Sequence, residues 1–117
     1  MRVLLLEDEL LIAKMIEAIV SSIAPEDSVT TITSPREMPQ DLSLYDVIVL
    51  DCHQDDLCTL SDTLPIVMAK KGRLVKVIVM SGSPSQDIHA LVTQYKVEFV
   101  HKPFDVAAFQ RLILGGI

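Results

Sequence analysis

The chain has 117 residues, the size of one domain with enough residues for a hydrophobic core that needs no disulfide or structural metal. Its net charge of −6 argues against direct nucleic-acid binding, because contacts to phosphates need clustered lysine and arginine. It holds two cysteines and no stretch near the roughly 18 apolar residues of a membrane span, so we expect a cytoplasmic protein that does not enter a membrane.

The chain begins with a predicted strand over residues 2–7, an unbroken apolar run that ends in acids. A helix follows, which Pro25 ends. Its apolar face is formed by residues at helical spacing: Ile12, Met15, Ile16, Ile19, Val20 and Ile23. A β-rich run over residues 29–33 predicts the second strand.

Ser34 and Pro35 predict the start of a second helix, with the serine as cap and the proline at the first helical position. Pro39 limits this helix to one or two turns. The branched apolar run over residues 46–51 predicts a third strand, buried on both faces. Residues 52–60 are polar and predicted to be irregular.

A third helix is predicted from a cap at Asp62 or Thr63 through Lys71, and a fourth strand over residues 74–80. Residues 83–86, Ser-Pro-Ser-Gln, are typical of a capping box that opens a fourth helix. The apolar face of that helix consists of Ile88, Leu91, Val92 and Tyr95.

A fifth strand is predicted over residues 97–101, and Asp105 caps a last helix that frays at Gly115-Gly116. Three residues of that helix are expected to point inward: Val106, Phe109 and Ile113. Five strands alternating with five helices predict a single α/β domain over residues 1–117. We expect a doubly wound, five-stranded parallel sheet between two layers of helices, with right-handed crossovers.

Polar side chains stand where these predicted strands end. They are Glu7, Asp8, Asp51, Ser81 and Lys102. Because ligands of open α/β sheets bind beyond the carboxyl ends of the strands, we expect these residues to converge at one edge. Three acids, one hydroxyl and one lysine indicate a site for a hard cation and a phosphoryl group.

The three carboxylates at this edge cannot all ionise cheaply, so either one keeps a proton or a cation lies between them. Oxygen ligands beside a phosphate suit Mg²⁺. Asp51, at the end of its strand, is a candidate nucleophile toward phosphorus. Ser81 is placed to bond a phosphoryl oxygen and Lys102 to neutralise another.

The chain resembles the receiver domain of two-component response regulators over essentially its whole length. Four segments carry the resemblance, in order and with family-like spacing: Leu6-Glu7-Asp8-Glu9, Val49-Leu50-Asp51, Val79-Met80-Ser81-Gly82 and His101-Lys102-Pro103-Phe104. The resemblance implies the flavodoxin-like strand order 2-1-3-4-5.

The resemblance also implies the metal ligands and the acceptor. Asp8 and Asp51 would bind Mg²⁺ or Mn²⁺ directly, Glu7 through water, and His53 through its backbone carbonyl. Asp51 would be the phosphoacceptor. No other cofactor is implied.

The remaining implied roles concern the switch. Ser81 would be the switch hydroxyl, Phe99 the switch aromatic and Lys102 the phosphate-binding lysine, joined to Pro103 by a cis peptide bond. A histidine kinase or histidine phosphotransfer protein would donate the phosphoryl group. The signal would appear on the surface formed by the fourth helix, fifth strand and fifth helix.

By this resemblance the domain is not an enzyme beyond its own phosphorylation and dephosphorylation. It would act on a downstream protein or a C-terminal output domain, and whether one follows Ile117 stays open, as does homodimer formation. The family's usual Met-Pro and Asp-Gly after the acceptor are replaced by residues 52–58. This departure leaves the loop shape unpredicted and supports the alternative of an interaction module that does not use phosphorylation. By the resemblance, His53 and Ser83 stand at positions that influence the phosphoryl lifetime, which stays unpredicted.

Three sequence features allow other interpretations. Glu7 and Asp8 would also suit the start of a helix, where acids favour the macrodipole. Cys52, His53 and Cys58 hint at zinc, but their spacing fits no common zinc pattern and a fourth ligand is missing. A flavodoxin-like cofactor binder would need a glycine-rich loop after the first strand, which this chain lacks.

Overall fold

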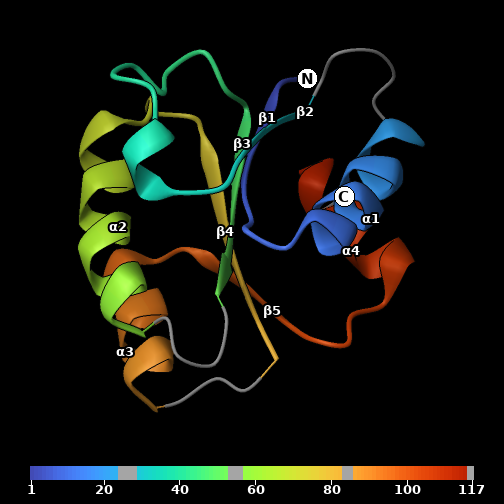
Figure 1. Ribbon diagram of the computed structural model, residues 1–117. Coiled ribbons are helices and arrows are strands. Elements are labelled where there is room, and N and C mark those ends of the chain that lie inside the picture. Colours follow the sequence, from blue (N-terminus) through green and yellow to red (C-terminus); the bar gives the residue numbers. More distant parts are fainter. Residues whose placement is uncertain (24–28, 53–56, 83–85, 116–117) are drawn as a thin grey trace.

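The computed structural model describes residues 1–23, 29–52, 57–82 and 86–115 (Figure 1). Its five strands form one parallel sheet in the order β2-β1-β3-β4-β5, which confirms the predicted fold class and strand order. The strands are β1 (Val3–Leu6), β2 (Val29–Ile32), β3 (Val47–Cys52), β4 (Lys76–Ser81) and β5 (Glu98–His101). The helical elements are α1 (Leu10–Ser21), η1 (Pro35–Glu37), α2 (Leu57–Lys70), α3 (Gln86–Tyr95) and α4 (Val106–Ile113).

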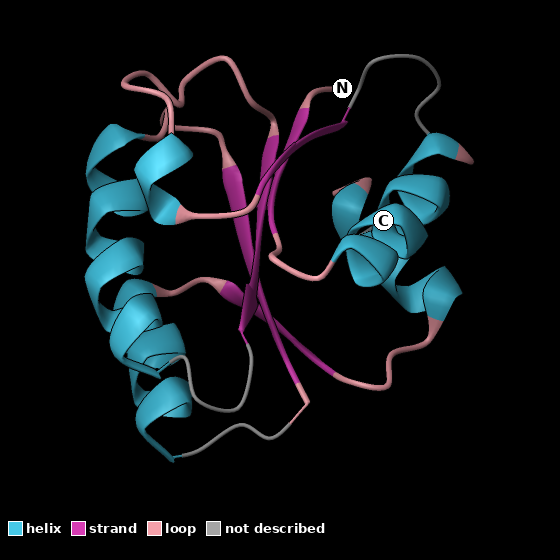
Figure 2. Cartoon of the chain, in the orientation of Figure 1, coloured by secondary structure: helices cyan, strands magenta, loops and turns pink. Residues whose placement is uncertain are grey.

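Helices cover both faces of the sheet, with α1 and α4 on one side and α2 and α3 on the other (Figure 2). Side chains alternate along each strand, so each strand contributes to two cores. Leu4, Ile48 and Val79 pack toward α2 and α3, whereas Leu5 and Val49 pack toward α1 and α4. Nearly continuous burial of β1 and β3 explains why these strands read as unbroken apolar runs.

Helix α1 buries a narrower face than its sequence predicts. Ala13, Ile16 and Val20 are buried, but Met15, which was expected on the apolar face, is 47% exposed. Met15 lies one position before Ile16, and that rotation of about 100° carries it past the edge of the buried stripe. The predicted end of this helix at Pro25 lies outside the described residues.

The second helical element is a single 3-10 turn, η1, so the described chain has four α-helices rather than five. Its predicted cap is confirmed, because the Ser34 hydroxyl accepts a hydrogen bond from the Arg36 amide at 3.2 Å. A second hydrogen bond stabilises this turn, because the Thr33 hydroxyl donates to the Glu37 carboxylate at 2.6 Å.

Helix α2 begins at Leu57, several residues before the cap predicted at Asp62 or Thr63. The prediction of an irregular segment through Leu60 was therefore wrong from Leu57 onward. Polar residues among 52–60 suggested a loop, but burial of Leu60 and Leu64 against the sheet outweighs that local signal.

The last two helices largely follow the prediction. Ile88 of α3 is buried, and the rest of its predicted face is partly buried. The Asp105 carboxylate caps α4 by accepting from the Ala107 amide at 2.9 Å. Phe109 and Ile113 are buried as predicted, but Val106 is 46% exposed, so its predicted inward position was wrong. No helix in the described ranges is long and apolar enough to cross a bilayer.

Candidate functional site at the carboxyl edge of the sheet

The strand register brings the predicted site residues to one edge. Leu6 of β1 pairs with Leu50 of β3, so Glu7 follows its strand at the level where Asp51 follows Leu50. Ser81 ends β4, and its carbonyl accepts a hydrogen bond from the Lys102 amide at 2.8 Å. Residues far apart in the sequence therefore meet because four parallel strands end together.

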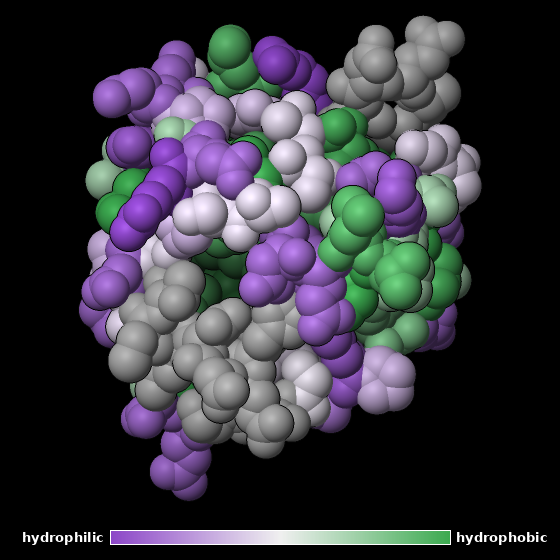
Figure 3. All heavy atoms as spheres, viewed as in Figure 1, coloured by the Kyte–Doolittle hydropathy of each residue, from purple (hydrophilic) through white to green (hydrophobic). Residues whose placement is uncertain are grey.

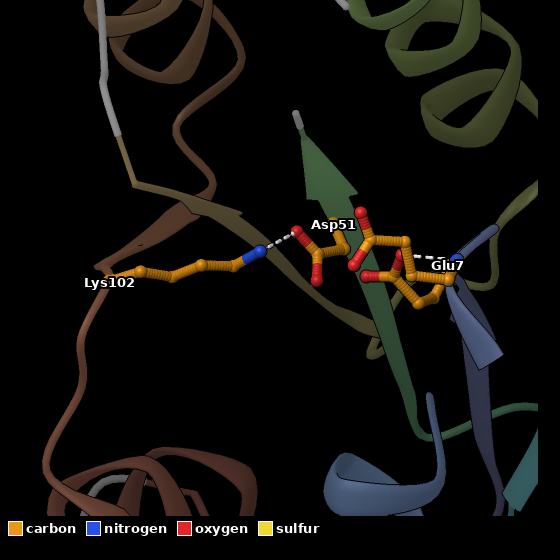
Figure 4. Close-up of polar contacts among 4 residues, drawn as sticks. Glu7, Asp51 and Lys102 are labelled. Atoms are coloured by element: carbon orange, nitrogen blue, oxygen red, sulfur yellow. Dashed lines mark hydrogen bonds and ion pairs between the residues drawn. The ribbon is translucent and has the colours of Figure 1, made fainter. Parts of the chain in front are cut away.

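An ion pair forms the centre of this edge. The Lys102 ammonium donates to Asp51 Oδ1 (Figure 4). The Asp51 side chain is fully buried, whereas the Lys102 side chain keeps 21% of its surface exposed. Lys102 reaches Asp51 from the segment that follows β5. The Lys102-Pro103 peptide bond in this segment is cis, as expected. The structure therefore brings together the residues predicted to be the acceptor and the phosphate-binding lysine, and their roles stay predictions.

Glu7 lies on the other side of Asp51 (Figure 4) and is only 2% exposed. Its Oε1 accepts a hydrogen bond from the Glu9 amide at 2.9 Å, and its own amide donates to the Ile32 carbonyl at 3.0 Å. These bonds fix the turn that carries Asp8 out of β1. Asp8 itself is exposed.

One pocket, with a volume of about 180 Å³, brings the three predicted acids together. Its lining is Leu6, Glu7, Asp8, Thr33, Ser34, Pro35 and Asp51. The wall formed by Thr33, Ser34 and Pro35 was not predicted to belong to the site, because these residues were interpreted only as a helix start. The signal was available, since they follow β2 at the same carboxyl edge of the sheet.

The donor atoms at this pocket suit a hard cation. Within the described part of the chain, Asp51 Oδ2 is buried and has no hydrogen-bond partner. A cation beside that oxygen would remove the cost of an unsatisfied buried acceptor. Among the described residues, no group of three His, Cys, Asp or Glu side chains is already arranged to hold a metal. The predicted ligand His53 lies outside the described residues, so the full ligand set stays a prediction.

Ser81 and Phe99 lie on β4 and β5, the two strands beyond β3 in the sheet. Ser81 is fully buried at the end of β4 and pairs in register with Cys52, the residue after Asp51. Phe99 is half-buried, packs against the core between the sheet and helices α2 and α3, and contacts the ring of His89 on α3, with centroids 5.2 Å apart. The contact from His89 was not predicted.

The structure bears on only one of the two alternatives that involve side chains near this edge. The side chains of Cys52, His53 and Cys58 lie outside the described set, so the zinc reading stays untested. At the start of α1 the helix cap is Glu9, whose side chain makes no capping bond, rather than Glu7 or Asp8.

The site and the sheet define a class, an open α/β protein with a buried carboxylate, a lysine and an acidic pocket at the carboxyl edge. Comparison with solved structures makes the class more specific. The receiver domain of sensor histidine kinase PA1611 from Pseudomonas aeruginosa, solved with a magnesium ion coordinated in its active site cleft, is 26% identical, with a TM-score of 0.71, over 96% of this chain and 93% of that one.

Two further structures share the fold at lower identity. A CheY-like response regulator from Mesorhizobium loti is 15% identical, with a TM-score of 0.74, over 99% of this chain and 98% of that one. A putative CpaE2 pilus assembly protein from Sinorhizobium meliloti is 15% identical, with a TM-score of 0.65, over the full length of both chains. No protein-family model matches this sequence, and no curated protein matches it significantly. The chain has the receiver-domain fold, as its motifs predicted.

Proposed function

We propose that this chain is a phosphorylation-activated receiver whose acceptor is Asp51. The observation that carries the proposal is the buried Asp51 carboxylate, paired with Lys102 and flanked by Glu7 at the edge where such sheets bind ligands. A carboxylate is a competent nucleophile toward phosphorus, and its acyl phosphate is an established kind of covalent intermediate.

The proposed reaction transfers a phosphoryl group from a histidine of the donor protein. An Asp51 carboxylate oxygen forms the new P–O bond while the donor's P–N bond breaks, and the electron pair of that bond stays on the imidazole nitrogen, which takes up a proton. Oδ2, which has no hydrogen-bond partner among the described residues, is the oxygen that would face the metal, and Oδ1 would form the bond to phosphorus as Lys102 moves its contact to the phosphoryl group. Lys102 then neutralises charge on the transferred group, since such reactions depend mainly on positioning and charge stabilisation.

Mg²⁺ (or Mn²⁺) is the metal that the donor set favours. Asp8 and Asp51 would bind it directly, Glu7 through water and His53 through its carbonyl oxygen. When bound, the ion would neutralise phosphoryl charge at the acidic end of the site. Carboxylates at one pocket and the buried Oδ2 of Asp51 support this assignment.

The phosphodonor partner, a histidine kinase or histidine phosphotransfer protein, would dock on α1. Exposed apolar side chains gather there: Leu10 is 69% exposed, Leu11 83% and Met15 47% (Figure 3). These residues follow directly from the turn that carries Glu7 and Asp8. An apolar surface beside an acidic pocket supports docking of a protein donor.

Mass spectrometry of the intact protein tests the acceptor. Wild type treated with acetyl phosphate and Mg²⁺ is expected to gain one phosphoryl group. Asp51→Asn is expected to gain none, and Asp46→Asn, an exposed aspartate beyond the other end of β3, is the matched control and should behave like wild type. Equal incorporation in wild type and Asp51→Asn would refute the assignment.

A second candidate is a receiver-like interaction module that does not use phosphorylation. Complete burial of the Asp51 carboxylate, together with its ion pair, favours a static structural role. The same experiment separates the two candidates, because the module predicts no added mass in wild type with any small phosphodonor. Under either candidate we propose a cytoplasmic domain that catalyses no reaction beyond its own modification.

A further inference from the structure

A second candidate site lies at the opposite edge of the sheet, where β4 and β5 begin. A surface hollow of about 360 Å³ opens between the α2–β4 connection and the α3–β5 turn. Three cationic side chains gather at it, Lys71, Arg73 and Lys96; Lys76 also lines it but directs its ammonium to α4. The remaining lining is apolar except for Glu98. We call this feature the basic hollow.

The cations of the basic hollow outnumber the single carboxylate in its lining, Glu98. Among described residues, no carboxylate forms an ion pair with Lys71, Arg73 or Lys96. The Lys76 ammonium does not contribute to this charge, because it donates to the Leu112 carbonyl of α4 at 2.6 Å, on the other face of the sheet (Figure 2). The whole protein carries a net charge of −6 with ten lysines and arginines, so three cations around one hollow form a local positive patch on an acidic protein.

Lys96 occupies a backbone position that favours glycine. Its φ is +55°, in the left-handed region, and it closes a Schellman motif at the end of α3. The Lys96 amide bonds the Thr93 carbonyl at 3.3 Å, and the Val97 amide bonds the Val92 carbonyl at 3.2 Å. A lysine in this conformation is less stable than glycine, so its presence at the rim of the basic hollow favours a role for the charge.

Next to the cations stands Leu74, which is 95% exposed. An apolar side chain that projects into solvent in this way suits contact with another polypeptide better than contact with a small anion. Within the described residues the hollow contains no aromatic side chain on which a nucleotide base would stack.

We propose that the basic hollow binds an acidic segment of a partner protein, with carboxylates meeting Arg73, Lys71 and Lys96 and an apolar side chain packing beside Leu74. Charge complementarity would speed association and specify the partner, and the apolar contacts would add affinity. This site is independent of Asp51 and does not rest on the proposed phosphorylation.

Fluorescence anisotropy with three labelled peptides tests the proposal. The peptides are four repeats of Glu-Glu-Leu, of Gln-Gln-Leu and of Lys-Lys-Leu. Wild type is expected to bind only the first, with binding that weakens as salt is raised. Arg73→Glu/Lys96→Glu should weaken binding at least tenfold. The charge-matched control Lys14→Glu/Arg111→Glu, on α1 and α4, should change it less than twofold.

A second variant separates binding from folding. Lys96→Gly relieves the left-handed strain, so it should raise the melting temperature by about 2–5 °C while weakening the Glu-Glu-Leu peptide severalfold. Weaker binding with unchanged or higher stability cannot come from misfolding. If Lys96→Gly is more stable and binds like wild type, the lysine serves no such site.

Other occupants would show themselves in the same experiments. Absence of peptide binding up to millimolar concentration overturns the proposal. Full competition by inorganic phosphate at matched ionic strength would make the hollow a small-anion site. Binding to phosphatidylglycerol vesicles without peptide binding would make it a membrane contact. Self-association of wild type that Arg73→Glu/Lys96→Glu abolishes would make the occupant a second copy of this chain. Each of these results contradicts the peptide assignment.

Discussion

Asp51 and Lys102 form an asymmetric pair. The carboxylate is fully buried, whereas the ammonium retains contact with solvent. Removing the lysine would leave a buried charge without a partner, and removing the carboxylate charge would leave a lysine that can turn toward water. The two single substitutions should therefore differ in their cost, although they break the same contact.

We expect Lys102→Met to lower the free energy of unfolding by about 2–3 kcal/mol, below the usual range for a buried pair because the lysine is partly exposed. Asp51→Asn should cost less than about 1 kcal/mol. In the double variant most of the Lys102→Met cost should disappear, because no buried charge remains. Urea denaturation in the absence of divalent cations measures all three, and strictly additive costs would contradict the asymmetry.

Metal binding should reveal itself at the residue scale through stability. A cation that binds only the folded protein stabilises it by roughly 2.7 kcal/mol at a hundredfold excess over its dissociation constant. Mg²⁺ should therefore raise the melting temperature of wild type. Asp8→Asn should raise the metal-free melting temperature, because repulsion in the acidic pocket falls, and should blunt the Mg²⁺ response.

Asp87→Asn is the control for that experiment, since Asp87 is an exposed acid in the first turn of α3 and outside the pocket. Both variants and wild type are compared at matched ionic strength. An identical Mg²⁺ shift in wild type and Asp8→Asn would show that the pocket does not bind the ion.

The site residues were predictable from sequence to the extent that strand ends were. Glu7, Asp51 and Ser81 each follow or end an unbroken apolar run. The parallel register of β1, β3 and β4 then brings these strand ends to the same edge of the sheet. The Thr33–Pro35 wall was missed because its local signal, a capped turn, accounts fully for those residues. The contact between His89 and Phe99 depends on how α3 lies over β5, which no local pattern specifies.

At the scale of elements, the errors came where tertiary packing overrode local composition. Helix α2 starts at Leu57 and runs through Pro65, a residue that by itself disfavours a helix interior. Burial of Leu60, Leu64 and Val67 on the sheet compensates for it. Elements whose ends carry a chemical cap, η1 and α4, were placed well, because a cap depends only on neighbouring residues.

The exposed face of α1 gives a prediction that separates protein docking from chemistry. Leu11→Glu should leave phosphorylation by acetyl phosphate unchanged, because the side chain is 83% exposed and does not line the Asp51 pocket. Phosphoryl transfer to Leu11→Glu from a phosphorylated histidine kinase or phosphotransfer protein should be at least tenfold slower than transfer to wild type. The comparison uses donor proteins that phosphorylate wild type. Radiolabelled transfer on the second timescale measures the rate.

Leu44→Glu is the matched control for docking on α1, since Leu44 is 61% exposed in the segment before β3. It should not affect transfer from either kind of donor. If both leucine variants slow protein donors equally, the effect comes from added negative charge rather than from a docking surface on α1.

At the scale of the whole molecule, the strand order links the site to a distant surface. β4 ends at Ser81 and β5 leads to Lys102, and the chain continues from these two strands into α3 and α4. Phe99 of β5 contacts His89 of α3, so under the proposed function a movement of Phe99 would reach an outer helix through this contact. The surface formed by α3, β5 and α4 is therefore the output surface expected under the proposed function.

Energy decides how many contacts such a switch requires. Moving a two-state equilibrium from about 1:99 to 99:1 needs roughly 5.5 kcal/mol of differential binding. One hydrogen bond to a charged group supplies about 1.5–3 kcal/mol. The Ser81 hydroxyl alone is therefore insufficient, and the Lys102 contact and repacking around Phe99 must contribute the remainder.

We expect the phosphate mimic beryllium fluoride, with Mg²⁺, to shift the NMR signals of α3, β5 and α4 in wild type, including the His89 ring. Ser81→Ala should bind the mimic but shift these signals only partly, and Lys102→Ala should shift them least. Phe99→Leu should bind the mimic, but the signal of the His89 ring should no longer shift. The Phe99 ring that contacts His89 is absent from this variant. Unchanged signals in wild type, with mimic binding confirmed by fluorine NMR, would favour the static interaction module, since a filled site would then have no effect on the output surface.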